Sequence, residues 1–159
     1  MRPGMATGLV LALILAAGVP GHLRGQSPGQ GAAPDTHAAA VSYFPAGDVE
    51  ARFAKGGTLV DGANWRVMTS VRTGGGEAEQ HTVDTDIFHV LEGSATFVTG
   101  GVMTGAHETA PDETRGTGLE GGTERTLAAG DVITVAAGVP HWFKAVDGRV
   151  KYFVVKVRR

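Results

Sequence analysis

The stretch GDVITVAAGVPHWF, residues 130–143, decides the fold that we predict for this chain. Val132–Val135 consists of β-branched residues, and Ala137–Pro140 has the composition of a tight turn. His141 then opens a second run that is rich in aromatic and aliphatic residues. The stretch therefore predicts a strand, a turn and a second strand. It places His141 at the rim of a sheet, where a histidine can bind a metal.

The remainder of the chain indicates an all-β protein. Its 159 residues, of which 42% are hydrophobic, are enough for one domain with a core. Its 25 glycines separate short β-branched runs, a pattern typical of many short strands and tight turns. Val49 and Phe53 lie four positions apart before Gly56-Gly57, which predicts one short N-terminal helix capped at or near Asp48.

Further strands are predicted over 41–44, 64–73, 86–91, 95–99, 123–127 and 150–157. The second of them alternates between two faces, and 86–91 and 95–99 form an antiparallel hairpin around Glu92-Gly93-Ser94. Residues 100–122 show no period and are expected to be a functional loop or a mobile excursion. Such strands suggest a double-sheet jelly roll or small barrel with an inner cavity.

Charge and cysteine content exclude several classes of function. The formal net charge is −2 and the pI is about 6.3, with no basic stripe, so a nucleic-acid partner is not expected. The sequence contains no cysteine, which excludes disulfides, thiolate nucleophiles and zinc–cysteine sites.

The N-terminus has the layout of a secretory signal peptide. Arg2 precedes the apolar run Leu9–Ala17, and small or turn residues follow at Gly18–Gly21. The run is too short to span a bilayer. We therefore expect a signal peptide over 1–21, a disordered linker over 22–40 and one domain over 41–159. The mature protein would be periplasmic or secreted, with no integral membrane segment; a true start at Met5 would leave the apolar run intact.

A second group of polar residues could meet His141. Glu79 and His81 are two positions apart, so they face the same side of an extended segment. Asp86 is an odd number of positions from His81, and a turn or bulge at 83–85 is needed to point both inward. With that turn, Glu79, His81 and Asp86 converge, and His141 completes the set.

These four side chains carry the chemistry of a metal site. Two imidazoles and one carboxylate, from His81, His141 and Asp86, form the facial triad of non-haem iron enzymes. With Glu79 added, two nitrogens and two carboxylate oxygens favour manganese or iron over copper. Glu79 could instead orient a ligand or act as a general base. His81 and His141 could also be polar rim residues of a metal-free barrel.

The two stretches together resemble the two motifs of the cupin superfamily. Glu79-x-His81, four residues, Asp86, six residues and Gly93 follow the spacing of the first motif. Gly130, five residues, Ala136-x-Gly138, two residues and His141 follow the second. Identity departs at four positions, where the family has His, Glu, Pro and Asn and this chain has Glu79, Asp86, Ala136 and Ala145.

The resemblance covers about residues 64–157. It implies a cupin jelly-roll β-barrel with one divalent transition metal in its mouth, iron or manganese before zinc or nickel, and a homodimer. The function that it implies is metal-assisted chemistry on a small oxygenated molecule, by a dioxygenase, an isomerase or a lactone-opening enzyme. In the last two cases Glu79 would be the catalytic base. The alternatives are a non-catalytic module that binds a small ligand or sugar, and a structural dimer with a vestigial pocket.

Four other residues have weaker claims to function. His89 is out of phase with Asp86 and should face the other side of its strand. His107 lies in the long loop, where an exposed histidine is the default. Arg115 could hold a carboxylate substrate, although a solvated arginine is the more common case. Phe143 is in phase with His141 and is expected to line the cavity.

Overall fold

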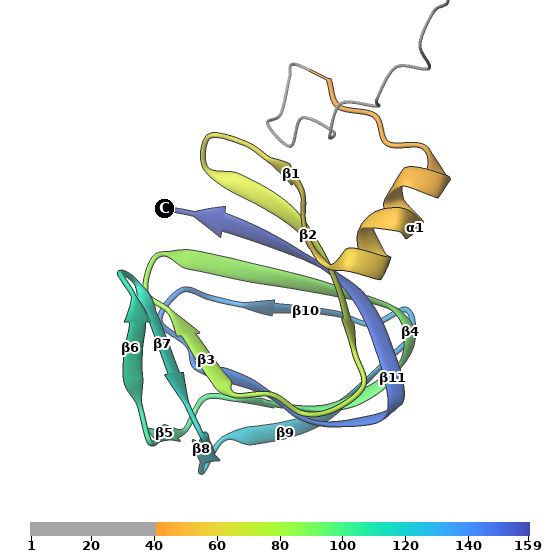
Figure 1. Ribbon diagram of the computed structural model, residues 1–159. Helices are drawn as coiled ribbons and strands as arrows, with labels where there is room; N and C mark the ends of the chain where they lie inside the picture. Colours follow the sequence, from red (N-terminus) through yellow and green to blue (C-terminus); the bar gives the residue numbers. More distant parts are fainter. Residues whose placement is uncertain (1–40) are drawn as a thin grey trace, which may run out of the picture. The chain divides into compact units, whose positions relative to one another are not determined.

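The structure is a computed structural model that describes residues 41–159 (Figure 1). The predicted signal peptide and linker lie outside the described residues. Within 41–159, α1 is too short and too polar to cross a membrane. The elements are α1 (Ala46–Lys55), β1 (Gly57–Asp61), β2 (Trp65–Arg72), β3 (Ala78–His81), β4 (Asp84–Thr99), β5 (Val102–Thr104), β6 (His107–Ala110), β7 (Glu113–Gly116), β8 (Gly118–Glu120), β9 (Thr123–Ala128), β10 (Val132–Val135) and β11 (His141–Arg158).

Nine of these strands form one sheet, which curls around a common interior (Figure 1). The strand order is β1-β2-β11-β3-β7-β6, while β4 pairs with β11, β9 and β10. The strands β5 and β8 form a separate two-stranded sheet. The predicted all-β jelly roll with one short helix is confirmed. The strands β10 and β11 do not pair with each other as a hairpin; both pair with β4.

The strand β4 is continuous, and the predicted hairpin over 86–99 is therefore wrong. Glu92-Gly93-Ser94 is not a turn, because both halves of β4 pair with β11. The register shifts close to Gly93, whose φ of 73° is left-handed. A Cβ there would collide with the carbonyl oxygen of Arg149. Gly93 therefore permits a β-bulge that bends two long paired strands around the interior.

The structure corrects the predictions for residues 41–61, the first part of the domain. The segment 41–44 is not a strand, and Val41 and Tyr43 are 85% and 84% exposed, so no packing holds it extended. The helix begins at Ala46, after Pro45, with no side-chain cap, and Asp48 lies in its first turn. The strand β1 was not predicted.

The segment 100–122 folds into four short strands, β5 to β8, which the sequence did not predict because they show no clear period. The strand β7 pairs with β3 through Glu79 and Arg115, and so it joins this segment to the wall of the interior.

The interior is filled at one end by aromatic rings. Phe143 stacks on Tyr152 with 4.9 Å between ring centroids, and Phe88 contacts both at 5.7 Å. These rings belong to one buried cluster, which leaves the other end of the interior open for a polar cavity. The helix α1 packs on the outer surface, where Phe53 lies 4.9 Å from Phe153.

Candidate metal centre

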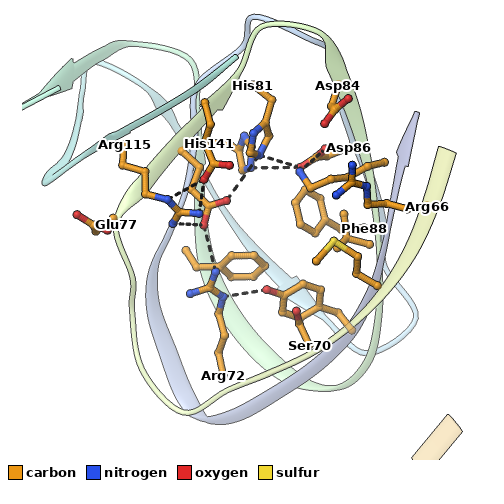
Figure 2. Close-up of a pocket in the computed structure, with 17 residues that line it drawn as sticks. Arg66, Ser70, Arg72, Glu77, His81, Asp84, Asp86, Phe88, Arg115 and His141 are labelled. Atoms are coloured by element: carbon orange, nitrogen blue, oxygen red, sulfur yellow. Dashed lines mark hydrogen bonds and ion pairs between the residues drawn. The ribbon is translucent and has the colours of Figure 1, made fainter. Parts of the chain in front are cut away.

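Two neighbouring strands place three candidate ligands on one face. Glu79 and His81 are two residues apart on β3, and Glu79 is the direct cross-strand partner of His141 at the start of β11. One donor atom from each of these three side chains lies within 4.8 Å of the other two. The rings of His81 and His141 are 5.5 Å apart, and both point into the cavity (Figure 2).

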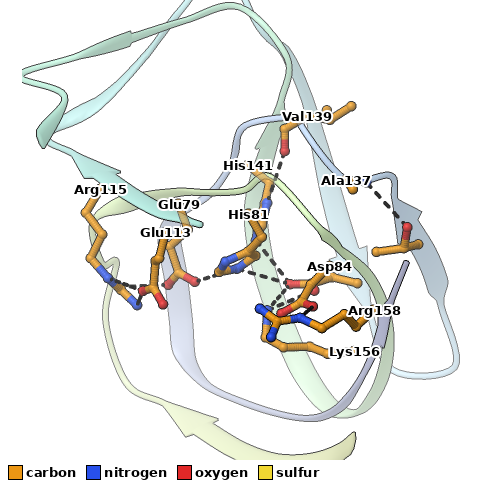
Figure 3. Close-up of polar contacts among 12 residues, drawn as sticks. Glu79, His81, Asp84, Glu113, Arg115, Ala137, Val139, His141, Lys156 and Arg158 are labelled. Carbon is orange, nitrogen blue, oxygen red and sulfur yellow. Dashed lines mark hydrogen bonds and ion pairs between the residues drawn. The ribbon is translucent and has the colours of Figure 1, made fainter. Parts of the chain in front are cut away.

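Asp86 approaches the same point from β4. The chain bends at Thr82-Val83, as the spacing of His81 and Asp86 requires. The Oδ2 atom of Asp86 lies 3.5 Å from Nε2 of His81 and 3.6 Å from Nε2 of His141. All four predicted residues therefore meet. Asp86 differs from Glu79 in that Lys156, which is labelled in Figure 3, donates hydrogen bonds to both oxygens of Asp86, at 2.8 and 2.7 Å.

The histidines have the free donor atoms that a metal requires. Among the described residues, Nε2 of His81 is a buried side-chain atom with no hydrogen-bond partner. A buried polar atom without a partner is costly, and a metal ion would satisfy it. Nδ1 of His141 faces the carbonyl oxygen of Val139 at 3.5 Å, an arrangement that leaves Nε2 free to coordinate. The residues present therefore fit a metal ion.

Electrostatics keep the donors in the required protonation states. Burial would raise the pKa of Glu79, but contact with His81 and the charges of Arg115, His141 and Arg72 lower it to about 2. Burial lowers the pKa of His141, although Asp86 and Glu79 oppose this shift. Glu79 is thus a carboxylate and His141 a neutral imidazole near neutral pH, the forms that bind metals.

Two arginines hold Glu79 in place: Arg72 was not singled out from the sequence, and Arg115 was considered there only as a residue that could hold a carboxylate substrate. Nη2 of Arg72 and Nη1 of Arg115 donate to Oε1 of Glu79, at 3.3 and 3.2 Å. The other oxygen, Oε2, faces His81 at 3.6 Å. Arg115 also donates two hydrogen bonds to Glu113, at 2.8 and 2.6 Å, so it is held at a fixed position. The sequence suggested a solvated Arg115, but its strand β7 was not predicted.

The alternation of side chains along β2 was one sequence signal for the polar wall of the cavity. Arg66, Ser70 and Arg72 share one face of this strand, and that face lines the cavity (Figure 2). In most sheets the apolar face is buried, whereas here the polar face looks inward because the barrel encloses a site. Phe143 lines the cavity as predicted, and the exposed His89 faces away from it. His107 lies exposed on β6.

The cavity has a volume of about 280 Å³. Sites for drug-sized ligands have volumes of roughly 300–1,000 Å³, so this one suits a smaller molecule. Its wall combines the four candidate ligands with charged and aromatic side chains. Polar groups that converge around a small cavity are typical of a binding or catalytic site.

Comparisons with known proteins support the fold. No family model and no curated protein matches the sequence. A Bacillus halodurans protein of known structure is 14% identical, with a TM-score of 0.54 over 79% of this chain and 87% of that one. An RmlC-like cupin with a double-stranded β-helix fold from Methanocaldococcus jannaschii is 13% identical over 65% and 78%, with a TM-score of 0.45. A cupin 2 conserved barrel domain protein from Salinispora arenicola is 16% identical over 60% and 64%, with a TM-score of 0.41.

At these identities the likeness concerns the fold and transfers no reaction. The described residues share the fold of the Bacillus halodurans protein, a curled sheet as the sequence predicted, and the resemblance to the cupin superfamily rests on the two sequence motifs.

Proposed function

We propose that this protein is a metal-dependent cupin that acts on a small oxygenated molecule. Glu79, His81 and His141 would hold one divalent transition metal, and Asp86 would complete the set from the opposite strand. The single observation that carries this proposal is the buried Nε2 atom of His81, which has no hydrogen-bond partner among the described residues. Two imidazoles and carboxylate oxygens favour iron or manganese, with zinc or nickel as alternatives.

When bound, the metal would supply Lewis-acid polarisation of a substrate oxygen or, if it is iron, redox chemistry with oxygen. The residues of the chain would hold and orient the reactants. Phe88 and Phe143 form an apolar wall close to the histidines, because the Phe88 ring lies 5.6 Å from that of His141. This wall limits the access of water to one side of the site. The dioxygenase, isomerase and lactone-opening reactions remain the candidate activities.

The protonation state of Glu79 favours a role as metal ligand over a role as general base. A base is most effective when its pKa is near the working pH, whereas the pKa of Glu79 is about 2. Its two oxygens are also directed differently, with Oε1 toward the arginines and Oε2 toward His81. This geometry leaves one oxygen for coordination and fixes the other.

A competition titration with a chromogenic chelator tests the proposal. The wild-type protein should bind one equivalent of manganese or zinc. The variants His81→Ala and His141→Ala should bind at least about tenfold more weakly, because each loses a coordinating nitrogen. The matched control is His89→Ala, which removes an exposed histidine from the other face of β4. Equal affinity in all four proteins would refute the proposed ligands.

A second candidate function is a non-catalytic module that binds a small ligand or sugar in the same cavity. The polar and aromatic lining of the cavity supports ligand binding whether or not a metal is present. Absence of metal binding together with saturable binding of a small ligand would favour this module. Oxygen uptake or substrate turnover by the metal-loaded protein would favour the enzyme. If the protein binds neither a metal nor a small ligand, the structural dimer is the remaining alternative.

We also propose that the chain is exported and that it forms a homodimer. The signal-peptide pattern over residues 1–21 supports export, and the resemblance to cupins supports the dimer. Mass spectrometry of protein from the periplasmic or secreted fraction should give a mature N-terminus at about residue 19–22. Light scattering of the purified protein should give twice the mass of one chain. An uncleaved chain, or a monomer at micromolar concentration, would refute the respective proposal.

A further inference from the structure

Three strands place an unusual row of charges on the inner wall beside the candidate metal centre. Asp86 on β4 is the cross-strand partner of Lys156 on β11, and Lys156 is in turn the partner of Arg66 on β2. Directly opposite residues on adjacent strands have Cβ atoms roughly 4.5–5.5 Å apart and share a face of the sheet. All three side chains line the cavity.

Lys156 and Arg66 form a like-charge pair in this row. Opposite residues of like charge destabilise a sheet unless a counter-charge accompanies them. Lys156 has a counter-charge in Asp86, which accepts two of its hydrogen bonds. Within residues 41–159, Arg66 has one acidic contact, Asp61, at 3.8 Å from Nε to Oδ1. This distance is too long for a hydrogen bond, and the pair lies at the exposed rim.

The position of Arg66 makes it accessible to a ligand. Its side chain is 40% exposed, and it lines the cavity from β2 (Figure 2). A second hollow adjoins the first at its mouth, because Arg66, Asp84 and Lys156 line both. A molecule at the metal centre could therefore extend toward Arg66.

The net charge of the cavity lining also favours a ligand with negative charge. Its lining includes five carboxylates and four lysine or arginine side chains, so a bound divalent cation would leave an excess of one positive charge. The donors of Arg72 and Arg115 are engaged with Glu79, Tyr152 and Glu113. Arg66 is thus the cation of the cavity with the fewest contacts within the described residues.

We propose that the cavity binds a small anionic molecule, a carboxylate or a phosphate, whose charged oxygens lie between Arg66 and Lys156. This inference deepens the proposed function, because it assigns the chemical class of the ligand at the same centre. Arg66 would be the main anchor and would donate hydrogen bonds to the anion. Lys156 would contribute its third N–H group while it retains Asp86.

Calorimetric titrations with succinate, inorganic phosphate and the neutral analogue succinamide test this inference. Each probe is added to the zinc-loaded and to the metal-free protein. Succinate or phosphate should bind, succinamide should bind at least about tenfold more weakly, and Arg66→Gln should weaken anion binding at least about tenfold. The anion with the higher affinity identifies the preferred class. Arg66→Lys, which keeps the charge, should retain part of the affinity.

The matched control is Arg149→Gln, which removes an exposed arginine that contacts Glu92 at 3.6 Å and does not line the cavity. It should leave anion binding unchanged. As a direct reading, the Nε–H signal of Arg66 in nitrogen-15 NMR spectra should shift when the anion is added. Equal affinity of wild type and Arg66→Gln, equal affinity for succinamide, or no binding of either anion would refute the inference.

The two proposals fail in different ways. If the protein binds zinc but binds neither anion, only the role of Arg66 and Lys156 is overturned. Anion binding to Arg66 in a protein that binds no metal would support this inference and contradict the proposed metal centre.

Discussion

The most informative perturbation is Glu79→Gln in the metal-free protein, because it removes a charge and nearly preserves shape. A pKa lowered from 4.5 to about 2 corresponds to about 3 kcal/mol of preferential stabilisation of the charged form in the folded state. The side chain is 18% exposed, so solvent screening reduces this value only modestly. At pH 7 the variant should therefore be less stable by about 3 kcal/mol, or about 10 °C in Tm.

The stabilising contribution of Glu79 should depend on pH in a defined direction. The folded-state pKa lies below the unfolded value, so the contribution of Glu79 is fully present above pH 4.5 and is lost as the pH falls toward 2. Denaturant unfolding of wild type and Glu79→Gln from pH 7 to pH 2, with a chelator present, should give two curves that converge at low pH.

The control for this experiment is Glu124→Gln, because Glu124 forms an exposed ion pair with Lys144. Its effect should stay within about 1 kcal/mol at every pH. A constant difference between Glu79→Gln and wild type across the pH range would refute the account of Glu79 as a carboxylate held by the arginines.

The remaining predictions concern the scaffold. Gly93→Ala should lower the free energy of unfolding by at least about 2 kcal/mol, since its Cβ collides with the Arg149 carbonyl, whereas Gly148→Ala, at φ 66° with open space around it, should cost about 1 kcal/mol. Equal losses in chemical denaturation would show that the bulge is not constrained by this contact. Lys151→Met should speed amide exchange in α1, because the buried Nζ of Lys151 binds Glu50 at 2.7 Å. Unchanged exchange would show that other contacts hold the helix.

The sequence was sufficient to predict the fold class and the meeting of the four candidate ligands. The spacing of Glu79 and His81 on one strand face, and the turn required before Asp86, depend on local geometry that alternation reveals. His141 follows a turn of recognisable composition, so its place at the start of a strand could be predicted as well.

The partners of these residues could not be predicted, because they depend on the pairing of distant strands. Arg72, Arg115 and Lys156 reach the cavity only because β2 pairs with β11, and β11 and β7 both pair with β3, in one curled sheet. No local pattern encodes that adjacency. The prediction of a turn at Gly93 fails for a related reason, since Gly in a left-handed conformation occurs both in hairpin turns and in bulges, and only the pairing partner distinguishes the two.

Whether His81 of β3 and His141 of β11 bind one metal ion can be read from X-ray absorption spectroscopy of the zinc-loaded protein. The spectrum should show two imidazole nitrogens at about 2.0–2.1 Å together with oxygen ligands, and His141→Ala should show one imidazole. His89→Ala should match the wild-type spectrum. A coordination shell of oxygen alone, or an unchanged number of imidazoles in His141→Ala, would contradict binding by both histidines.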